Sequence, residues 1–522
     1  MCLWESITMN IAKIISRYAY EHKSRIAIVS GEESWTFAEV HERSNRLANG
    51  LRDLGVRKGD RVATLISNSP RYQEIEFALS KIVAIRVALN LRLNPEELIW
   101  QINDVEPKAL IMEAEGLSKI TSIRSKIAMV ENLICFGSAQ QNVIDYEELI
   151  SKGSPDEREV EVTGEDIWTI NYTSGTTGMP KGIVIPFRSN MAIFRNMLLD
   201  MIPHLTASDV YMSLQPLFPA GGSFILPCWA RGAAHVIVNR FDPETAFNAI
   251  RKWRVTLIKT VPTVLQRLVD SPDIKNEDLS SIHTIVYGGS PMAVEKLRKA
   301  IEIFGPVFIG NYGLTEAPQT DLVLTREDHK DPRKLGSAGK PYTMVEAKIV
   351  DESDQEIPIG QMGELIVRGD HIMHGYWKRP PESTMETLRR GWIYTRDIAR
   401  RDEDGYFYLV DRKSEMIISG GYNIYPNEVE QVIYQHPAVS EVAVVGVPDD
   451  QWGEAVKAVV CLKEGARVSE QELIDFCKDR LSSYKKPRSI DFVNTLPKNP
   501  VGKILRRQVR ESYWKGQDRR IH

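Results

Sequence analysis

The sequence has few of the features that mark membrane-spanning, secreted or nucleic-acid-binding proteins. No window approaches the roughly 18 apolar residues of a membrane-spanning helix, so no transmembrane segment is expected. Residues 1–8 lack the basic stretch and long apolar core of a signal peptide. A net charge of −4 over 522 residues gives no reason to expect nucleic acid as a partner.

Cysteine is scarce as well. The chain has five cysteines with no Cys-x-x-Cys spacing, which indicates reduced thiols and predicts a cytoplasmic protein. The histidines form no His-Glu-x-x-His motif, and His371 and His374 lie in a loop-like stretch where we predict no metal site. What is left is the composition of an ordinary soluble globular protein.

The order of strand-like and helical patterns predicts the fold. Residues 9–110 and 236–287 alternate between the two, which favours largely parallel sheets covered by helices. Short strands and tight turns begin near residue 336 and predict a small β-rich unit. We therefore predict an α/β protein with a large domain of two βαβ-layered sheets plus the β-rich unit (1–411), a hinge (412–414) and a small mobile α+β domain (415–522).

The most informative stretch runs from Tyr172 to Gly182 and follows an apolar, strand-like run. It contains three glycines, four hydroxyl side chains outside the tyrosine, and one lysine. Glycines let amide groups converge on an anion, but the order Pro-Lys-Gly differs from a Walker A loop. We predict a phosphate-binding loop made of Thr173, Ser174, Gly175, Thr176, Thr177, Gly178 and Lys181.

This loop resembles the signature of the adenylate-forming superfamily, which includes acyl- and aryl-CoA synthetases, firefly luciferase and the adenylation domains of peptide synthetases. The resemblance covers nearly the whole chain, since five separated motifs occur in the family's order. It implies ATP-dependent activation of a carboxylate, with the loop holding the β- and γ-phosphates that leave as pyrophosphate. Within the superfamily the chain looks most like a fatty-acyl-CoA synthetase.

Two further motifs come directly after predicted strands. Residues 311–316, Asn-Tyr-Gly-Leu-Thr-Glu, resemble a family motif whose aromatic residue packs on adenine and whose carboxylate holds Mg²⁺. Those roles fall to Tyr312 and Glu316, with Thr315 near the phosphate. The Gly-Gly-Ser-Pro turn after residue 287 would flank the adenine. The resemblance therefore adds to the ATP site Gly288, Gly289, Ser290, Asn311, Tyr312 and Gly313, and makes Glu316 the metal ligand.

The motif ending at Asp397 resembles the family's Trp-x-x-Thr-Gly-Asp, whose aspartate accepts both ribose hydroxyls. Here Arg396 replaces the usual glycine. Arg412 would contact ribose or phosphate, and Ser414 occupies a hinge position that is often Lys or Asp. The glycine loop beyond the hinge implies contacts to the pantetheine arm of coenzyme A from Ser419, Gly420, Gly421 and Tyr422.

Near the C-terminus, a Pro-Val-Gly-Lys turn presents Lys503, which in the family reaches the carboxylate and the α-phosphate. A fixed cation offsets the repulsion between a carboxylate and a triphosphate, and the charge that develops at phosphorus. The implied catalytic residues are Lys503, Thr315, Glu316 and Arg412.

The predicted acyl pocket departs from the family at one position. Pro219 stands where the family commonly has a histidine, which would leave a smaller and more open gate. The predicted pocket residues are Pro219, Ala220, Gly221 and Val261. Lys259 could meet a second polar group on the substrate, but we interpret it as an ordinary strand-end lysine.

These motifs predict a two-step ligase that uses ATP, Mg²⁺ and coenzyme A. The carboxylate attacks ATP to give an acyl-adenylate, and the small domain then rotates about the hinge to bring in the thiol. A medium- or long-chain fatty acid is the expected substrate, with an aromatic acid as the alternative. Three other functions stay open: loading of a carrier protein, a luciferase-like oxygenase, and a catalytically silent nucleotide-binding homologue. The sequence also leaves a homodimer open.

Overall fold

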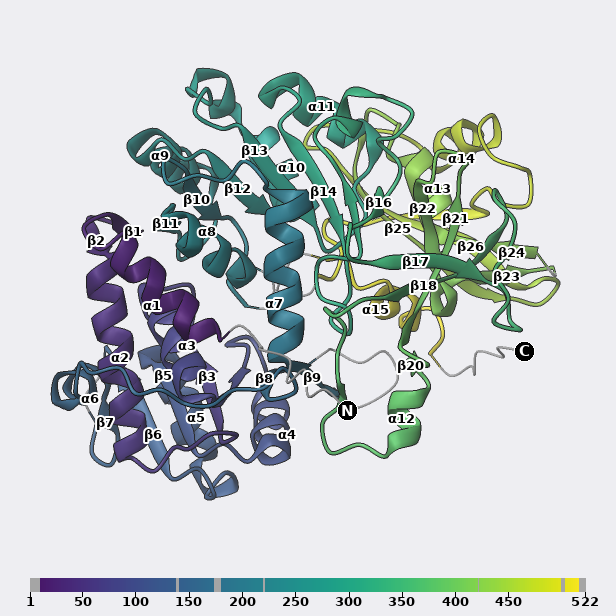
Figure 1. Ribbon diagram of the computed structural model, residues 1–522. Coiled ribbons are helices and arrows are strands. Elements are labelled where there is room, and N and C mark those ends of the chain that lie inside the picture. The colour runs from purple at the N-terminus through teal and green to yellow at the C-terminus, as the bar shows by residue number, and fades with distance from the viewer. Residues whose placement is uncertain are drawn as a thin grey trace, which may run out of the picture.

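The structure is a computed structural model that describes residues 10–137, 140–172, 180–218, 221–420, 422–498 and 503–515. It has two large α/β layers, a smaller β unit and a C-terminal α/β unit (Figure 1). This confirms the predicted fold class. Within the ranges described, no helix combines the length and the apolar character needed to cross a membrane.

The first layer is a sheet of eight described strands in the order β19-β9-β8-β4-β3-β5-β6-β7. Strands β8, β4, β3, β5, β6 and β7 pair in parallel, each with the next. At one edge, β9 pairs antiparallel with β8, and β19 pairs antiparallel with β9. Its strands are β3 (Arg61–Leu65), β4 (Ile85–Ala88), β5 (Ala109–Glu113), β6 (Asn132–Phe136), β7 (Ile144–Asp145), β8 (Ile167–Tyr172), β9 (Gly182–Pro186) and β19 (Gly375–Tyr376). Its helices are α2 (Phe37–Asp53), α3 (Pro70–Ile82), α4 (Pro95–Val105), α5 (Ala114–Ile123) and α6 (Tyr146–Lys152).

The second layer is a sheet of nine described strands in the order β16-β15-β14-β13-β12-β10-β11-β1-β2. Its strands are β1 (Ile26–Ser30), β2 (Glu33–Thr36), β10 (Val210–Ser213), β11 (Ala234–Ile237), β12 (Leu257–Thr260), β13 (Thr284–Gly288), β14 (Phe308–Tyr312), β15 (Leu322–Leu324) and β16 (Lys340–Pro341). Its helices are α1 (Ile11–Glu21), α7 (Phe187–Asn196), α8 (Ile225–Arg231), α9 (Pro243–Trp253), α10 (Pro262–Val269) and α11 (Val294–Phe304).

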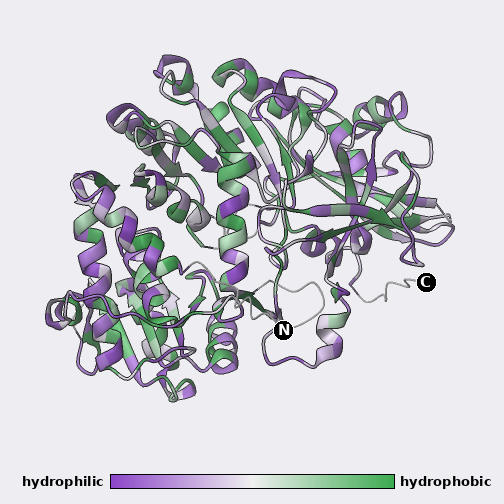
Figure 2. Ribbon diagram, viewed as in Figure 1, coloured by the Kyte–Doolittle hydropathy of each residue, from purple (hydrophilic) through white to green (hydrophobic). Residues whose placement is uncertain are grey.

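Burial on both faces explains why the central strands read as continuous apolar runs. Every residue of β12 and β13 is buried, because helices cover both sides of the sheet. Figure 2 shows hydrophobic residues along the strands and polar residues on the outer helices. Local signals set the helix starts: α2 and α4 each begin with a capping box, built on Thr36 with Glu39 and on Asn94 with Glu97.

The predicted β-rich unit is a sheet of β17 (Glu346–Val350), β18 (Met362–Arg368), β20 (Leu388–Arg389), β21 (Trp392–Arg401) and β22 (Phe407–Arg412), with helix α12 (Pro381–Met385) beside it. After a single helical turn, Lys413–Glu415, the C-terminal unit begins. It contains β23 (Ile417–Ser419), β24 (Tyr422–Ile424), β25 (Val439–Asp449), β26 (Gly453–Leu462), β27 (Ser489–Phe492), α13 (Pro426–Ile433), α14 (Glu470–Lys478) and α15 (Arg506–Glu511). The hinge at 412–414 stays a prediction.

Candidate functional site

Two predicted adenine-side motifs meet at the carboxyl ends of neighbouring parallel strands. β13 and β14 place Gly288 beside Asn311 in the sheet register. A Cβ on Gly288 would lie 2.4 Å from the carbonyl oxygen of Asn311, so only glycine fits there. Gly289 has a φ of +83°, and the whole stretch 311–316 is half-buried. The strand ends therefore form an accessible rim where a flat ligand can approach the backbone.

Asp397 joins two other predicted ATP-site residues. The Tyr312 hydroxyl donates to Asp397 Oδ2 at 2.6 Å, and Arg412 Nε donates to Asp397 Oδ1 at 3.2 Å. Burial, together with the charge of Asp397, raises the pKa of Tyr312 well above its ordinary value, so the phenol stays a donor. Each carboxylate oxygen can still accept a further hydrogen bond. The geometry suits the predicted binding of ribose hydroxyls.

Tyr376 links two predicted site residues on the other side of this rim. The Lys181 ammonium lies 5.0 Å from the centre of the Tyr376 ring, and the Tyr376 hydroxyl lies 3.1 Å from Glu316 Oε1. Burial raises the pKa of Tyr376 to about 12. Sequence reasoning missed this residue because no motif contains it. Its pairing with Ile183 in β9, next to the phosphate loop, is what brings it into the site.

Lys503 reaches this group from the small domain. It is half-buried, and burial followed by the positive charge of Arg412 lowers its pKa, while Glu415 and Asp397 act in the opposite direction. These effects place the lysine within electrostatic range of the residues that would hold the nucleotide. The charges of Arg412 and Asp397, two predicted ATP-site residues, thus act on Lys503 of the small domain.

A half-buried arginine fixes the segment that carries Lys503. Arg506, at the start of α15, forms ion pairs with three carboxylates: Asp411 at 3.0 Å, Glu415 and Glu430. Burial raises the pKa of Asp411 to about 6 despite the arginine beside it. This network, which the motifs did not reveal, ties the C-terminal helix to the end of β22 beside the predicted hinge.

The predicted coenzyme A loop is described in part. Gly420 has a φ of +57°, and a Cβ there would lie 2.3 Å from the Trp452 ring. Its N–H donates to the Trp452 carbonyl at 2.9 Å. Tyr422 is 55% exposed and stacks on Tyr484 with ring centres 4.6 Å apart. An exposed aromatic pair beside a tight glycine turn is a suitable surface for a long flexible cofactor.

Several predicted residues lie outside the described part of the chain: Thr173, Ser174, Gly175, Thr176, Thr177 and Gly178 of the phosphate loop, Pro219 and Ala220 of the acyl pocket, and Gly421. Of the acyl pocket, Gly221 begins a helical turn (Gly221–Phe224) and Val261 is the residue before α10. A Cβ on Gly221 would lie 2.5 Å from Ser213 Oγ at the end of β10. Both residues thus sit at the carboxyl ends of β10 and β12.

The interpretation of Lys259 as an ordinary strand-end lysine is wrong. The residue is only 2% exposed, and its ammonium donates to Asn311 Oδ1 at 2.5 Å. Every position of β12 is buried, so the lysine has no route to the protein surface along the strand.

Arg396 adopts the left-handed backbone conformation that favours glycine. Its φ is +60°, its N–H donates to Glu364 at 3.0 Å, and its half-exposed side chain lies 3.6 Å from Glu386. The charged side chain thus leaves the Asp397 position intact.

We expect Arg396→Gly to raise the free energy of unfolding by up to about 1 kcal/mol, because glycine relieves the left-handed strain but adds entropy to the unfolded chain. Urea denaturation would measure the change, with Arg390→Gly as the control, since Arg390 is left-handed at φ +50° in a nearby turn. A loss of stability in Arg396→Gly alone would show that the arginine side chain contributes more than the backbone strain costs.

The metal predicted at Glu316 fits the residues present. In the part of the chain that the structure describes, no three His, Cys, Asp or Glu residues gather to hold an ion. Mg²⁺ in phosphoryl-transfer sites needs only one or two carboxylates and otherwise binds substrate phosphates and water. A single carboxylate, Glu316, meets that need, with Tyr376 between it and the phosphate-loop lysine Lys181. His371 instead bonds Asp321 at 2.6 Å in the core, with both side chains fully buried.

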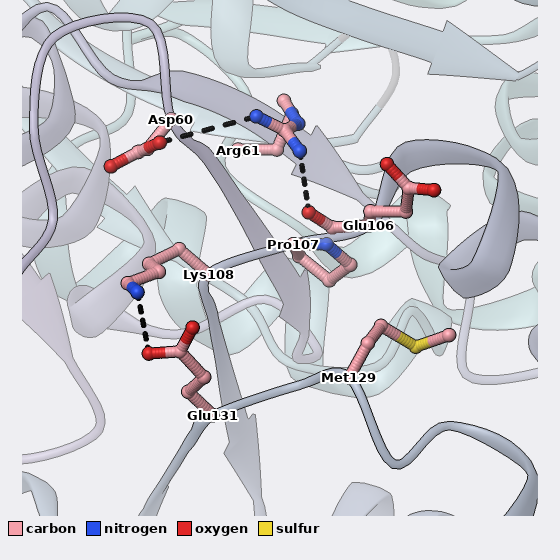
Figure 3. A pocket seen from close by; sticks show the side chains of 7 residues that line it. All are labelled: Asp60, Arg61, Glu106, Pro107, Lys108, Met129 and Glu131. Carbon is pink, nitrogen blue, oxygen red and sulfur yellow. Dashed lines mark hydrogen bonds and ion pairs between the residues drawn. The ribbon is translucent and has the colours of Figure 1, made fainter.

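Two hollows on the surface lie away from this site. The first is lined by Asp60, Arg61, Glu106, Pro107, Lys108, Met129 and Glu131, at the amino ends of β3 and β5 (Figure 3). Its charges are already used: Arg61 donates to the carbonyls of Val105 and Glu106, and Lys108 pairs with Glu131 at 2.5 Å. The second, between α10 and α11, likewise lies at the amino ends of strands. Neither touches the predicted motifs.

The fold and these clusters define a nucleotide-dependent ligase built from a large and a small domain. Comparison with known proteins supports this: the family described as AMP-binding enzyme matches residues 15–377, and AMP-binding enzyme C-terminal domain matches residues 428–503. The chain belongs to this family, the adenylate-forming superfamily. The predictions of that superfamily and of an AMP-forming acid–thiol ligase are confirmed.

Three relatives illustrate its range. The chain is 37% identical to a feruloyl-CoA synthase of Amycolatopsis over 93% of this chain and 96% of that one. It is 30% identical to the medium/long-chain-fatty-acid–CoA ligase FadD8 of Mycobacterium tuberculosis, over 96% and 89%. Among solved structures, the anthranilate CoA ligase AuaEII in complex with anthranoyl-AMP superimposes with a TM-score of 0.90 at 29% identity, over 97% and 98%.

Proposed function

We propose that this enzyme is an ATP-dependent carboxylate–CoA ligase that forms an acyl-adenylate and then a thioester. The observation that supports it most directly is the cluster in which Tyr312 and Arg412 bond the two oxygens of Asp397. The charges of Arg412 and Asp397 also act on the pKa of Lys503, which the small domain carries. A cation there can neutralise the incoming carboxylate and the α-phosphate at once, whereas a nucleotide-binding protein without catalysis has no need of it.

In the first half-reaction, a carboxylate oxygen attacks the α-phosphorus and pyrophosphate leaves. Asp397 and Tyr312 position the ribose and adenine, and Lys503 stabilises the charge that develops on the α-phosphate. Lys181 contributes positive charge where the β- and γ-phosphates lie. Mg²⁺, when held through Glu316, would neutralise the departing pyrophosphate.

In the second half-reaction, the thiol sulfur attacks the acyl carbon, and AMP leaves with the electron pair of the acyl–oxygen bond while the thiol proton is lost to solvent. Rotation about residues 412–414 would withdraw Lys503 and present Ser419, Gly420 and Tyr422 to the pantetheine arm. One site then serves two reactions in turn.

For the acid, we favour an aromatic acid over the medium- or long-chain fatty acid first expected. The relative with the higher identity is named for an aromatic acid, and a buried lysine next to the predicted acyl pocket suits a polar substrate better than an alkyl tail. Fatty acids remain the second candidate because FadD8 is also similar along its length.

The test is formation of AMP and thioester over a panel of acids, aliphatic from short to long and aromatic of benzoate and cinnamate type, each with and without coenzyme A. Thioester formation with aromatic acids would support the proposal. Turnover of long aliphatic acids alone would reverse the substrate assignment. Pyrophosphate release without thioester would indicate a carrier protein as acceptor, and no AMP release with any acid would refute the ligase.

A further inference from the structure

Lys259 ends on the side of the sheet where the predicted acyl pocket lies. It is in register with Ser213 of β10 and Val286 of β13. Alternate residues of a strand face the same side, so Lys259 shares the side of Leu257, which packs with Tyr211 and Phe224. Its ammonium lies 5.9 Å from the centre of the Phe224 ring, and Phe224 ends the turn that Gly221 begins.

The ammonium is poorly satisfied for so buried a group. Its three N–H bonds meet, among the described residues, one acceptor at hydrogen-bond distance, Asn311 Oδ1, and no carboxylate. Lys81 shows what a satisfied buried lysine looks like here: it contacts Ser44, Asn45 and the His41 ring. Burial alone lowers the pKa of Lys259 to about 7. Leaving donors of this kind without acceptors costs free energy, which argues for an acceptor supplied from outside the chain.

Asn311 indicates which part of the site the Lys259 ammonium faces. Its Oδ1 accepts from Lys259, and its Nδ2 donates to the Gln319 carbonyl at 3.1 Å, which fixes the amide orientation. Asn311 itself belongs to the predicted adenine motif. The ammonium of Lys259 therefore lies between Asn311, on the nucleotide side of the site, and the Phe224 ring, which ends the turn that Gly221 begins on the acyl side.

We propose that Lys259 is a specificity-determining residue that donates a hydrogen bond to a second oxygen of the acid substrate, remote from the carboxylate that is activated. The inference rests on the proposed ligase function and names its substrate class: aromatic acids whose ring carries a hydroxyl or a further carboxylate. Hydrocarbon acids of the same size leave the donors unmet and are disfavoured.

The test compares acids that differ by one oxygen group: benzoate with 4-hydroxybenzoate and with terephthalate, and cinnamate with 4-hydroxycinnamate. For the wild-type enzyme we expect a kcat/KM preference of about 10- to 100-fold for the oxygenated member, since a hydrogen bond to a charged donor has that effect. Lys259→Met should reduce the preference to about one, chiefly by slowing the oxygenated acids. Lys299→Met removes an exposed lysine of α11 that pairs with Asp270, and it should leave the preference unchanged.

Three results would overturn the proposal: no preference in the wild-type enzyme, equal slowing of both members of each pair in Lys259→Met, or a retained preference in that variant. Calorimetric binding of the same acids in the presence of a non-hydrolysable ATP analogue gives a readout independent of turnover. If the proposed ligase function is wrong but the role of Lys259 is right, no acid will give AMP release, while calorimetry will still show tighter binding of the oxygenated acid in each pair. If Lys259→Met does not fold, the same kcat/KM preference is measured in Lys259→Gln and compared with that of the wild-type enzyme.

Discussion

Replacing Lys503 with alanine should slow acyl-adenylate formation about 10²- to 10³-fold, the usual cost of removing one preorganised group that stabilises transition-state charge. The second half-reaction should change little, because in the proposed mechanism the small domain withdraws this lysine before the thiol attacks. Pyrophosphate exchange measures the first step, and thioester formation from synthetic acyl-adenylate and coenzyme A measures the second.

The lowered pKa of Lys503 adds a pH signature to the same experiment. Because the lysine acts as a cation, adenylation in the wild-type enzyme should decline as pH rises through that lowered value, below the range of an ordinary lysine. In Lys503→Ala this limb should disappear from the pH profile.

Lys498→Ala is the matched control for Lys503→Ala. Lys498 belongs to the same segment but pairs with Glu441 at 2.6 Å on the small domain, so its loss should leave both half-reactions near the wild-type rate. An Lys503→Ala enzyme that still formed acyl-adenylate at the wild-type rate would show that the lysine has no catalytic role, whatever its position.

The sequence motifs were enough to predict the fold class, the superfamily and the residues that the structure gathers around Asp397. Tyr312 and Arg412 end β14 and β22, and Asp397 lies within β21. Each belongs to a contiguous motif that can be recognised in the sequence. Ion-pair partners that lie far apart in the sequence could not be predicted. Arg506 could have paired with any of 70 acidic residues, and the fold selects Asp411, which is 95 positions away.

Lys259 shows a different limit. It lies in Leu-Ile-Lys-Thr, a strand buried on both faces, where no alternation of polar and apolar residues tells which way a side chain points. Only the register with β13 and β14 reveals that the lysine reaches Asn311. Tyr376 was missed because no motif contains it, and only the pairing of β19 with β9 brings it to Lys181.

Arg506→Met should lower the free energy of unfolding of the small domain by about 3–5 kcal/mol, the effect of removing one partner from a buried ion pair. Asp411 and Glu430 are 3% and 8% exposed at their side chains, so neither carboxylate can turn to water without moving the chain. Urea denaturation, followed by tryptophan fluorescence, measures the change. Arg507→Met, the next residue of α15, is the control, because its exposed pair with Glu511 contributes at most about 0.5 kcal/mol.

The loss in Arg506→Met should depend on pH in a defined direction. Asp411 already has a folded-state pKa of about 6, raised from 3.8, and removing the arginine raises it further. A carboxyl group with a raised pKa binds more protons in the folded state, so its contribution to stability falls as pH rises from 3.8 through the folded value. The deficit should therefore be larger above pH 6 than below it. A deficit equal to that of Arg507→Met, or one that shrinks as pH rises, would show that the three carboxylates do not depend on Arg506.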